Sequence, residues 1–101
     1  MLDVQRSPIH GLGLFATEKI RKGKLIGRAD GGQTTKDGPH VLWLNEQIGL
    51  KVQNELRFIN HSPIPNAVYY DDATVVALRT IRKGEEITHD YTGKRAPWSA
   101  A

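Results

Sequence analysis

The sequence contains no cysteine among its 101 residues. Disulfide bonds and thiolate zinc sites are therefore excluded for this chain, and the reducing interior of a cell is the expected compartment. No apolar run approaches the ~18 residues that span a bilayer, and the stretch Met1–Arg6 lacks the apolar segment of a secretory signal. We therefore expect an intracellular protein without membrane contact, cytoplasmic in a bacterium and nuclear in a eukaryote or for a virus.

Helical periodicity is also scarce, because no segment keeps apolar residues at helical spacing over three turns. The chain instead alternates short β-prone runs with turn signals such as Lys22-Gly23 and Asp37-Gly38-Pro39. Many short strands with frequent turns predict one mostly β domain over residues 1–101. The predicted strands lie within residues 24–27, 41–44, 50–52, 67–70 and 74–78.

Charge of either sign is present only in moderation: 14 Lys and Arg residues against 11 Asp and Glu residues give a net charge of +3. The basic residues are scattered along the sequence, which favours a solvated surface and predicts no direct contact with nucleic acid. One sequence is repeated, since Ile20-Arg21-Lys22-Gly23 recurs as Ile81-Arg82-Lys83-Gly84. We interpret the two copies as equivalent turns that each lead into a strand.

Three segments carry more unusual residues than folding alone requires. In the first, Gly11 and Gly13 flank Leu12, so the backbone can approach a ligand closely. The third glycine and the following helix of a dinucleotide site are absent. In the second, Asn60 and His61 follow an apolar strand end and need polar partners, which either a structural turn or a ligand site would supply.

The third segment, Gly84 to Tyr91, ends in a tyrosine that no apolar run follows, which is compatible with a simple hairpin. In order and spacing, however, the three segments resemble the SET-domain methyltransferases. Residues 57–66 resemble the family motif Arg-Phe-Ile-Asn-His-Ser-Cys-x-Pro-Asn, with Pro63 in place of the cysteine. Residues 84–91 resemble its motif Gly-Glu-Glu-(Leu/Ile)-Thr-x-Asp-Tyr.

This resemblance implies a mostly β, SET-type β-clip fold of small curled sheets with a knot-like C-terminal segment. It implies a single SET domain with a core at residues 6–92 and a short tail at residues 93–101. The implied activity is S-adenosylmethionine-dependent methyl transfer to a lysine amine of a protein or peptide substrate. The implied cofactor-binding residues are Gly11, Leu12, Gly13, Asn60, His61 and Trp98.

The resemblance further implies that Tyr91 and His89 are catalytic residues. A tyrosine hydroxyl with a pKa near 10 is a poor base at neutral pH, so Tyr91 would orient the amine and the methyl group. His89 stands where the family usually has Phe or Tyr. We expect His89 to be neutral in the productive state, so that turnover falls below about pH 6.5. We also expect the enzyme to add more than one methyl group to a lysine. No metal site is expected, since the four histidines lack metal-ligand spacing.

Several features depart from the family pattern. Pro63 removes a zinc-binding thiol, no Cys-rich C-terminal segment follows, and residues 41–54 replace a much longer insert. Ala29 stands where a channel tyrosine is usual. A homodimer is one arrangement that would supply the missing substrate wall. These departures keep two alternatives open: a SET-like module that binds cofactor or peptide without turnover, and a β-clip binding module of the SAF or antifreeze type.

Overall fold

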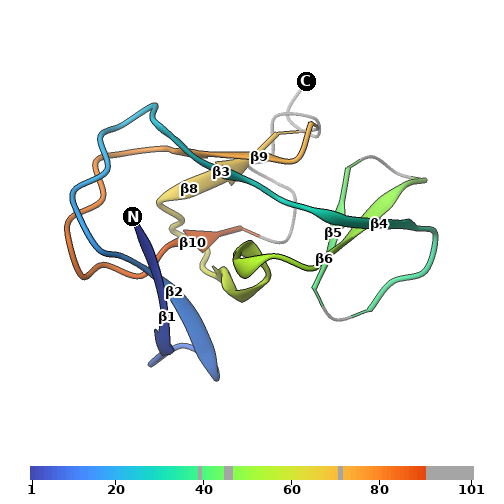
Figure 1. Ribbon diagram of the computed structural model, residues 1–101, viewed down its shortest axis with the longest axis horizontal. Coiled ribbons are helices and arrows are strands. Elements are labelled where there is room, and N and C mark those ends of the chain that lie inside the picture. Colours follow the sequence, from blue (N-terminus) through green and yellow to red (C-terminus); the bar gives the residue numbers. More distant parts are fainter. Residues whose placement is uncertain (39, 45–46, 71, 91–101) are drawn as a thin grey trace.

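The computed structural model describes residues 1–38, 40–44, 47–70 and 72–90. These residues form short strands and one turn of 3₁₀ helix, η1 (Glu55–Phe58), so the predicted mostly β fold is confirmed (Figure 1). No helix in these ranges is long and apolar enough to cross a membrane. The strands are β1 (Leu2–Arg6), β2 (Leu12–Ala16), β3 (Leu25–Arg28), β4 (Gly31–Thr34), β5 (Val41–Trp43), β6 (Gly49–Val52), β7 (Asn60–His61), β8 (Ala67–Tyr69), β9 (Thr74–Ala77) and β10 (Thr88–His89).

The strands belong to four small sheets. β1 and β2 form an antiparallel hairpin, and β3, β9 and β8 form an antiparallel sheet in that order. A second antiparallel sheet has the order β4-β6-β5, and β7 pairs in parallel with β10. β3 and β4 follow one another closely and connect the two three-stranded sheets (Figure 1). This arrangement agrees with the expected set of small curled sheets.

The repeated tetrapeptides lie side by side. Ile20 and Ile81 form an antiparallel bridge, in which each backbone N–H donates to the other carbonyl, at 2.8 Å and 2.7 Å. Both isoleucine side chains are completely buried. The pairing therefore joins two segments that are far apart in sequence and places their apolar side chains in the core.

The two turns also make the same hydrogen bonds. The N–H of Gly23 donates to the carbonyl of Ala77, and the N–H of Gly84 donates to the carbonyl of Ala16, both at 2.8 Å. Gly23 and Gly84 have φ values of 85° and 88°, in the left-handed region that favours glycine. The predicted equivalence of the turns is confirmed, and it amounts to a local two-fold relation between β2–β3 and β9–β10.

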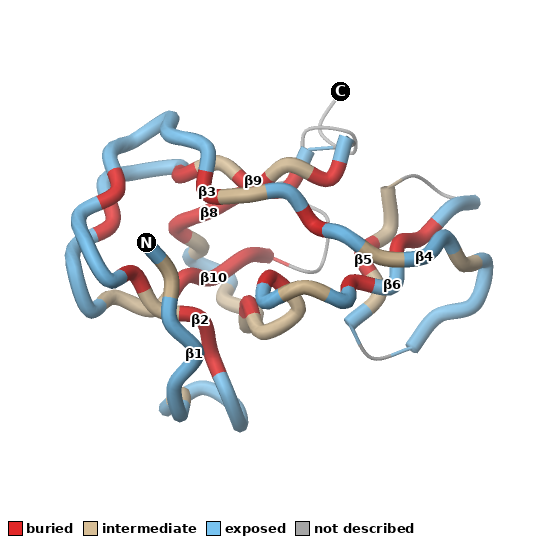
Figure 2. The backbone as a smooth tube through the Cα atoms, in the orientation of Figure 1, coloured by how far each residue is buried: buried red, intermediate tan, exposed pale blue. Residues whose placement is uncertain are grey.

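The core lies where β2, β10 and the β3-β9-β8 sheet meet, as the buried segments of Figure 2 show. β9 buries alternate side chains, whereas all three residues of β8 are buried. The largest completely buried side chains are those of Leu14, Ile20, Ile59, Val75, Ile81 and Ile87.

In the β4-β6-β5 sheet, β5 and β6 lie within residues 41–54, where the sequence predicts a shortened insert. β4 and β6 approach closely at Gly31, where an added methyl group would overlap the carbonyl oxygen of Lys51. At the neighbouring Gly32, a methyl group would meet nothing within 4 Å. The close pairing of β4 with β6 therefore requires glycine at one position and not at the next.

This difference gives a matched pair of variants. Gly31→Ala should destabilise the protein by about 1–3 kcal/mol, because a strand must shift to relieve the overlap. Gly32→Ala should remain within about 1 kcal/mol of the wild type, on the stabilising side, because it lowers the entropy of the unfolded chain. Urea unfolding of both variants measures the difference. Equal stabilities would contradict the close approach of Gly31 to Lys51.

Candidate active site

The segment that includes β10 runs between two other parts of the chain. On one side, the N–H of Ala16 donates to Glu85 at 3.0 Å, and the N–H of Ile87 donates to Leu14 at 2.7 Å. On the other side, β10 pairs in parallel with β7, so that Thr88 and His89 lie opposite Asn60 and His61. The three segments singled out in the sequence are therefore brought together, which accounts for the expected tucking of the C-terminal segment beside the Asn-His-Ser loop.

Asn66 holds this segment in place. Its buried side chain accepts a hydrogen bond from the N–H of Thr88 at 2.9 Å and donates to the carbonyl of Glu86 at 2.8 Å. Its backbone N–H donates to the Thr88 hydroxyl at 3.3 Å. Sequence reasoning did not select Asn66 as a site residue, although it closes the second motif. Its role is to position the residues on either side of Ile87.

Glu86 connects the motifs through its side chain. The Ser7 hydroxyl lies 2.7 Å and 2.8 Å from the two carboxylate oxygens, and the amide nitrogen of Asn60 donates to Oε2 at 2.8 Å. Gly13 lies against the same carboxylate, and a methyl group there would overlap it. Sequence reasoning missed Glu86 and Ser7. The one local sign of a role for Glu86 was its position directly before the apolar Ile87.

The amide of Asn60 has more acceptors around it than it has hydrogens. Besides Glu86, its nitrogen lies 3.0 Å from the carbonyl oxygen of His10 and 3.1 Å from that of Leu12. An amide nitrogen carries only two hydrogens, whereas an ammonium group carries three and a positive charge. Three converging acceptors, one of them a carboxylate, therefore suit a cationic amine.

The glycines of the first motif shape the loop that supplies two of these carbonyls. Gly11 has a φ of 44°, and its carbonyl accepts a hydrogen bond from the N–H of Ser7 at 2.8 Å, which closes the β1–β2 hairpin. Leu12 is exposed and Gly13 is buried. The structure therefore brings Gly11, Leu12 and Gly13 together with Asn60.

His89 is buried, with 3% of its surface exposed, and its ring packs edge-on against Tyr69 with the ring centroids 4.9 Å apart. Burial lowers the pKa of His89 to about 4; Asp90 and the Ala67 backbone oppose this shift, and His61 adds to it. The expectation of a neutral His89 agrees with this value. The expected fall in turnover below about pH 6.5 assumed an unshifted imidazole, and burial instead keeps His89 neutral to a lower pH.

The remaining site predictions are placed as follows. His61 is half-buried, and its Nδ1 lies 3.7 Å from the carboxylate of Asp90. Ala29 is a buried core residue whose N–H donates to the carbonyl of Ala73 at 2.8 Å. Tyr91 and Trp98 lie outside the described residues.

Comparison with known proteins identifies the family. Residues 11–92 match the sequence model of the SET domain, and the chain belongs to this family. A crystal structure of a Plasmodium falciparum protein, assigned as a histone methyltransferase, superposes with a TM-score of 0.70 at 23% identity, covering 90% of this chain and 96% of that one. The likeness shows that the two chains share a fold, and the family match identifies this fold as that of a SET domain. The family match also favours a SET domain over a SAF- or antifreeze-type module.

Curated relatives are longer proteins. The histone-lysine N-methyltransferase MEDEA of Arabidopsis thaliana is 28% identical over 123 aligned residues, covering 95% of this chain and 18% of that protein. The H3 lysine-4-specific enzyme of Schizosaccharomyces pombe is 33% identical over 110 residues, covering 84% of this chain and 12% of that enzyme. The chain thus spans less than a fifth of each. Both alignments are longer than the 101 residues of this chain, so each relative carries residues without a counterpart here.

The low pKa of His89 predicts how stability depends on pH. The folded state keeps His89 neutral down to about pH 4, whereas the unfolded chain takes up a proton near pH 6.5. The resulting stability is complete above about pH 6.5 and is lost as the pH falls towards 4, by up to about 3 kcal/mol. In His89→Phe, the free energy of unfolding should therefore fall less steeply over this range.

Urea unfolding at several pH values measures these slopes. His10→Gln is the matched control, because His10 is exposed and its removal should leave the slope of the wild type. If His89→Phe and the wild type lost stability in parallel between pH 6.5 and pH 4, His89 would not be the buried neutral group.

Proposed function

We propose that the chain transfers the methyl group of S-adenosylmethionine to a lysine amine of a protein substrate. The observation that carries this proposal is the convergence of the Gly11–Gly13 loop, Asn60 and the β10 segment at one cluster of hydrogen-bond acceptors. Membership of the SET family and the activity named for the curated relatives support it. The proposed domain is the single SET domain predicted from the sequence, with its core at residues 6–92.

The hydrogen-bond acceptors around Asn60 suit the ammonium group of this cofactor. The carbonyls of His10 and Leu12 and the carboxylate of Glu86 surround the amide nitrogen of Asn60, and the ammonium group of the cofactor would share these acceptors with that nitrogen. The side chain of Asn60 has an amide oxygen as well as a nitrogen, so it can also accept from that group. We further propose that the Asn60–His61 backbone holds the adenine edge and that Trp98 covers the cofactor. When bound, S-adenosylmethionine supplies an electrophilic methyl group on a positively charged sulfur.

The protein then has to bring a neutral amine into line with that methyl group. A free lysine has a pKa near 10.4, and desolvation in an apolar channel lowers it. His89 and Tyr69 offer buried, uncharged aromatic surface next to the β10 backbone. We propose that the Tyr91 hydroxyl orients the amine, and that most of the rate acceleration comes from this positioning.

The proposed substrate is a lysine-containing protein, and histone tails are the first class to test, since both curated relatives described above are named as histone-lysine methyltransferases. A binding module without turnover is the second candidate. The short region 41–54 favours it, because the described strands β5 and β6 lie there in place of the longer insert that the resemblance implies for a substrate platform. We propose that a second copy of the chain supplies the missing wall if the enzyme is active.

Tyr91→Phe tests the activity. The variant should bind S-adenosylmethionine with nearly unchanged affinity while turnover collapses, because only the orientation of the amine and the methyl group is lost. Calorimetric titration measures binding, and mass spectrometry of a mixed histone substrate counts methyl groups on lysine. If the wild type binds the cofactor but methylates nothing, the module without turnover is correct. Equal loss of binding and turnover would make Tyr91 a structural residue.

Asn60→Ala tests the cofactor site. Calorimetric titration should show cofactor binding weaker by about 1–3 kcal/mol, because a half-buried hydrogen-bonding partner is removed. Ser7→Ala is the matched control, since it removes hydrogen bonds to Glu86 and leaves the Asn60 amide in place. Its effect on cofactor affinity should be smaller. Unchanged affinity in Asn60→Ala would refute the assignment of this residue.

A further inference from the structure

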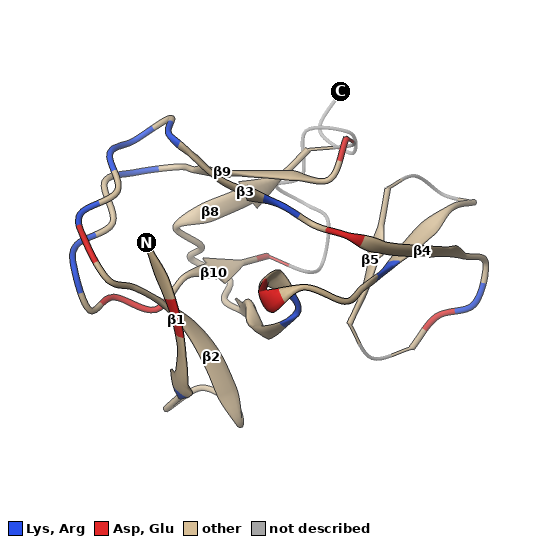
Figure 3. Cartoon of the chain, in the orientation of Figure 1, with Lys and Arg blue, Asp and Glu red and all other residues tan. Residues whose placement is uncertain are grey.

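The two equivalent turns carry all of the chain's net positive charge. Residues 18–24 and 79–85, called here the turn surface, contain seven cationic residues and two carboxylates, a net charge of +5. The rest of the chain contains seven cationic residues and nine carboxylates, a net charge of −2. Figure 3 shows the cationic residues gathered on the paired loops at one end of the molecule. They are Lys19, Arg21, Lys22, Lys24, Arg79, Arg82 and Lys83, and all are exposed.

The backbone fixes the two halves of this surface against each other. The reciprocal Ile20–Ile81 bridge and the equivalent bonds of Gly23 and Gly84 hold the turns in a two-fold arrangement. Arg21-Lys22 therefore corresponds to Arg82-Lys83 across that relation. The cations are thus presented from a rigid base, which lowers the entropy lost on binding a ligand.

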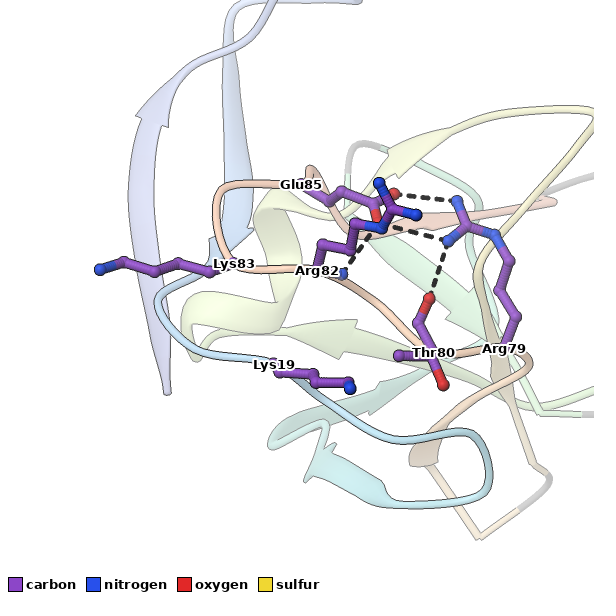
Figure 4. A pocket seen from close by; sticks show the side chains of 6 residues that line it. All are labelled: Lys19, Arg79, Thr80, Arg82, Lys83 and Glu85. Carbon is purple, nitrogen blue, oxygen red and sulfur yellow. Dashed lines mark hydrogen bonds and ion pairs between the residues drawn. The ribbon is translucent and has the colours of Figure 1, made fainter.

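Little of this charge is neutralised locally. Glu85 is bound by the guanidinium of Arg79 at 3.0 Å and 3.4 Å and by the backbone N–H of Arg82 at 2.8 Å. Within the described part of the chain, Arg79–Glu85 is the ion pair of the turn surface. An open pocket of about 850 Å³ lies beside this pair (Figure 4), lined by Lys19, Arg79, Thr80, Arg82, Lys83 and Glu85.

The chemistry of the turn surface favours phosphate over other anionic partners. Neither segment contains an aromatic residue, so the stacking platforms typical of single-stranded nucleic acid sites are missing. Lysine supplies four of the seven cations, and lysine is depleted in protein–protein interfaces. Exposed Lys and Arg on a fixed backbone are instead typical of contacts with the phosphates of a duplex.

We propose that the turn surface binds the phosphate backbone of duplex DNA without reading its base sequence. The sequence predicted no contact with nucleic acid because the basic residues are scattered along the chain. The fold gathers half of them on one end of the molecule, and the present proposal departs from that expectation. The seven cations of the turn surface take no part in the hydrogen bonds of the Glu86–Asn60 cluster, so DNA binding can be measured apart from the proposed methyl transfer.

Fluorescence anisotropy with a labelled mixed-sequence duplex tests this proposal. A duplex of about 20 base pairs, at about 3.4 Å each, is longer than the 36 Å long axis of the protein. The double variant Lys22→Glu/Lys83→Glu should weaken binding at least tenfold at low salt. The slope of log K against log salt should become shallower by about 2, since two phosphate contacts are lost.

Lys36→Glu/Lys51→Glu is the matched control, because it changes the net charge equally at two exposed lysines outside the turn surface. Its affinity for the duplex should stay within about twofold of the wild type at the same salt concentration. Circular dichroism and cofactor titration should be unchanged in both double variants. The duplex titration therefore tests DNA binding alone, and the cofactor titration reports on the methyl-transfer proposal separately. Equal weakening in the two variants, or no binding by the wild type, would overturn the proposal. Displacement of the duplex by polyglutamate at matched charge would overturn it in favour of an acidic protein.

Discussion

The carboxylate of Glu86 lies between three segments that are distant in sequence, and its placement constrains each of them. It receives hydrogen bonds from Ser7 and Asn60, and it occupies the space that a side chain at residue 13 would need. Glu86 is half-buried, and the hydrogen bonds to its charged oxygens are stronger than those between neutral groups. The hairpin loop, β7 and the segment before β10 must therefore close around it together, and this closure forms the candidate cofactor site.

The same segment connects the site to the paired turns. It begins at Gly84, whose left-handed backbone closes the second turn, and it continues through Ile87 into β10. Hydrogen bonds to Ala16 and Leu14 on one side and to Asn66 on the other fix its path. Because one short stretch carries the turn, the core isoleucine and the site, its displacement would disturb all three.

Local patterns predicted the parts of this structure that depend on neighbouring residues. Short strands, the two Ile-Arg-Lys-Gly turns and the three motifs were visible in the sequence and agree with the fold. Ser7 and Glu86 were not selected, because their bond joins positions 79 residues apart, and no local pattern encodes that pairing. The titration of His89 was misjudged for a similar reason, since its burial against Tyr69 depends on the packing of β8 beside β10. Scattered lysines and arginines likewise gave no sign that the fold would gather them.

Charge is distributed unevenly along the segment from residue 82 to residue 90. Arg82 and Lys83 are exposed at the turn, whereas His89 is buried and neutral above about pH 4 and Asp90 lies near His61. Exposed charges are screened by salt over about 8 Å at physiological ionic strength, whereas buried groups are screened much less. Within this segment, the buried and uncharged ring of His89 therefore affects an amine in the proposed site differently from the solvated cations of the turn.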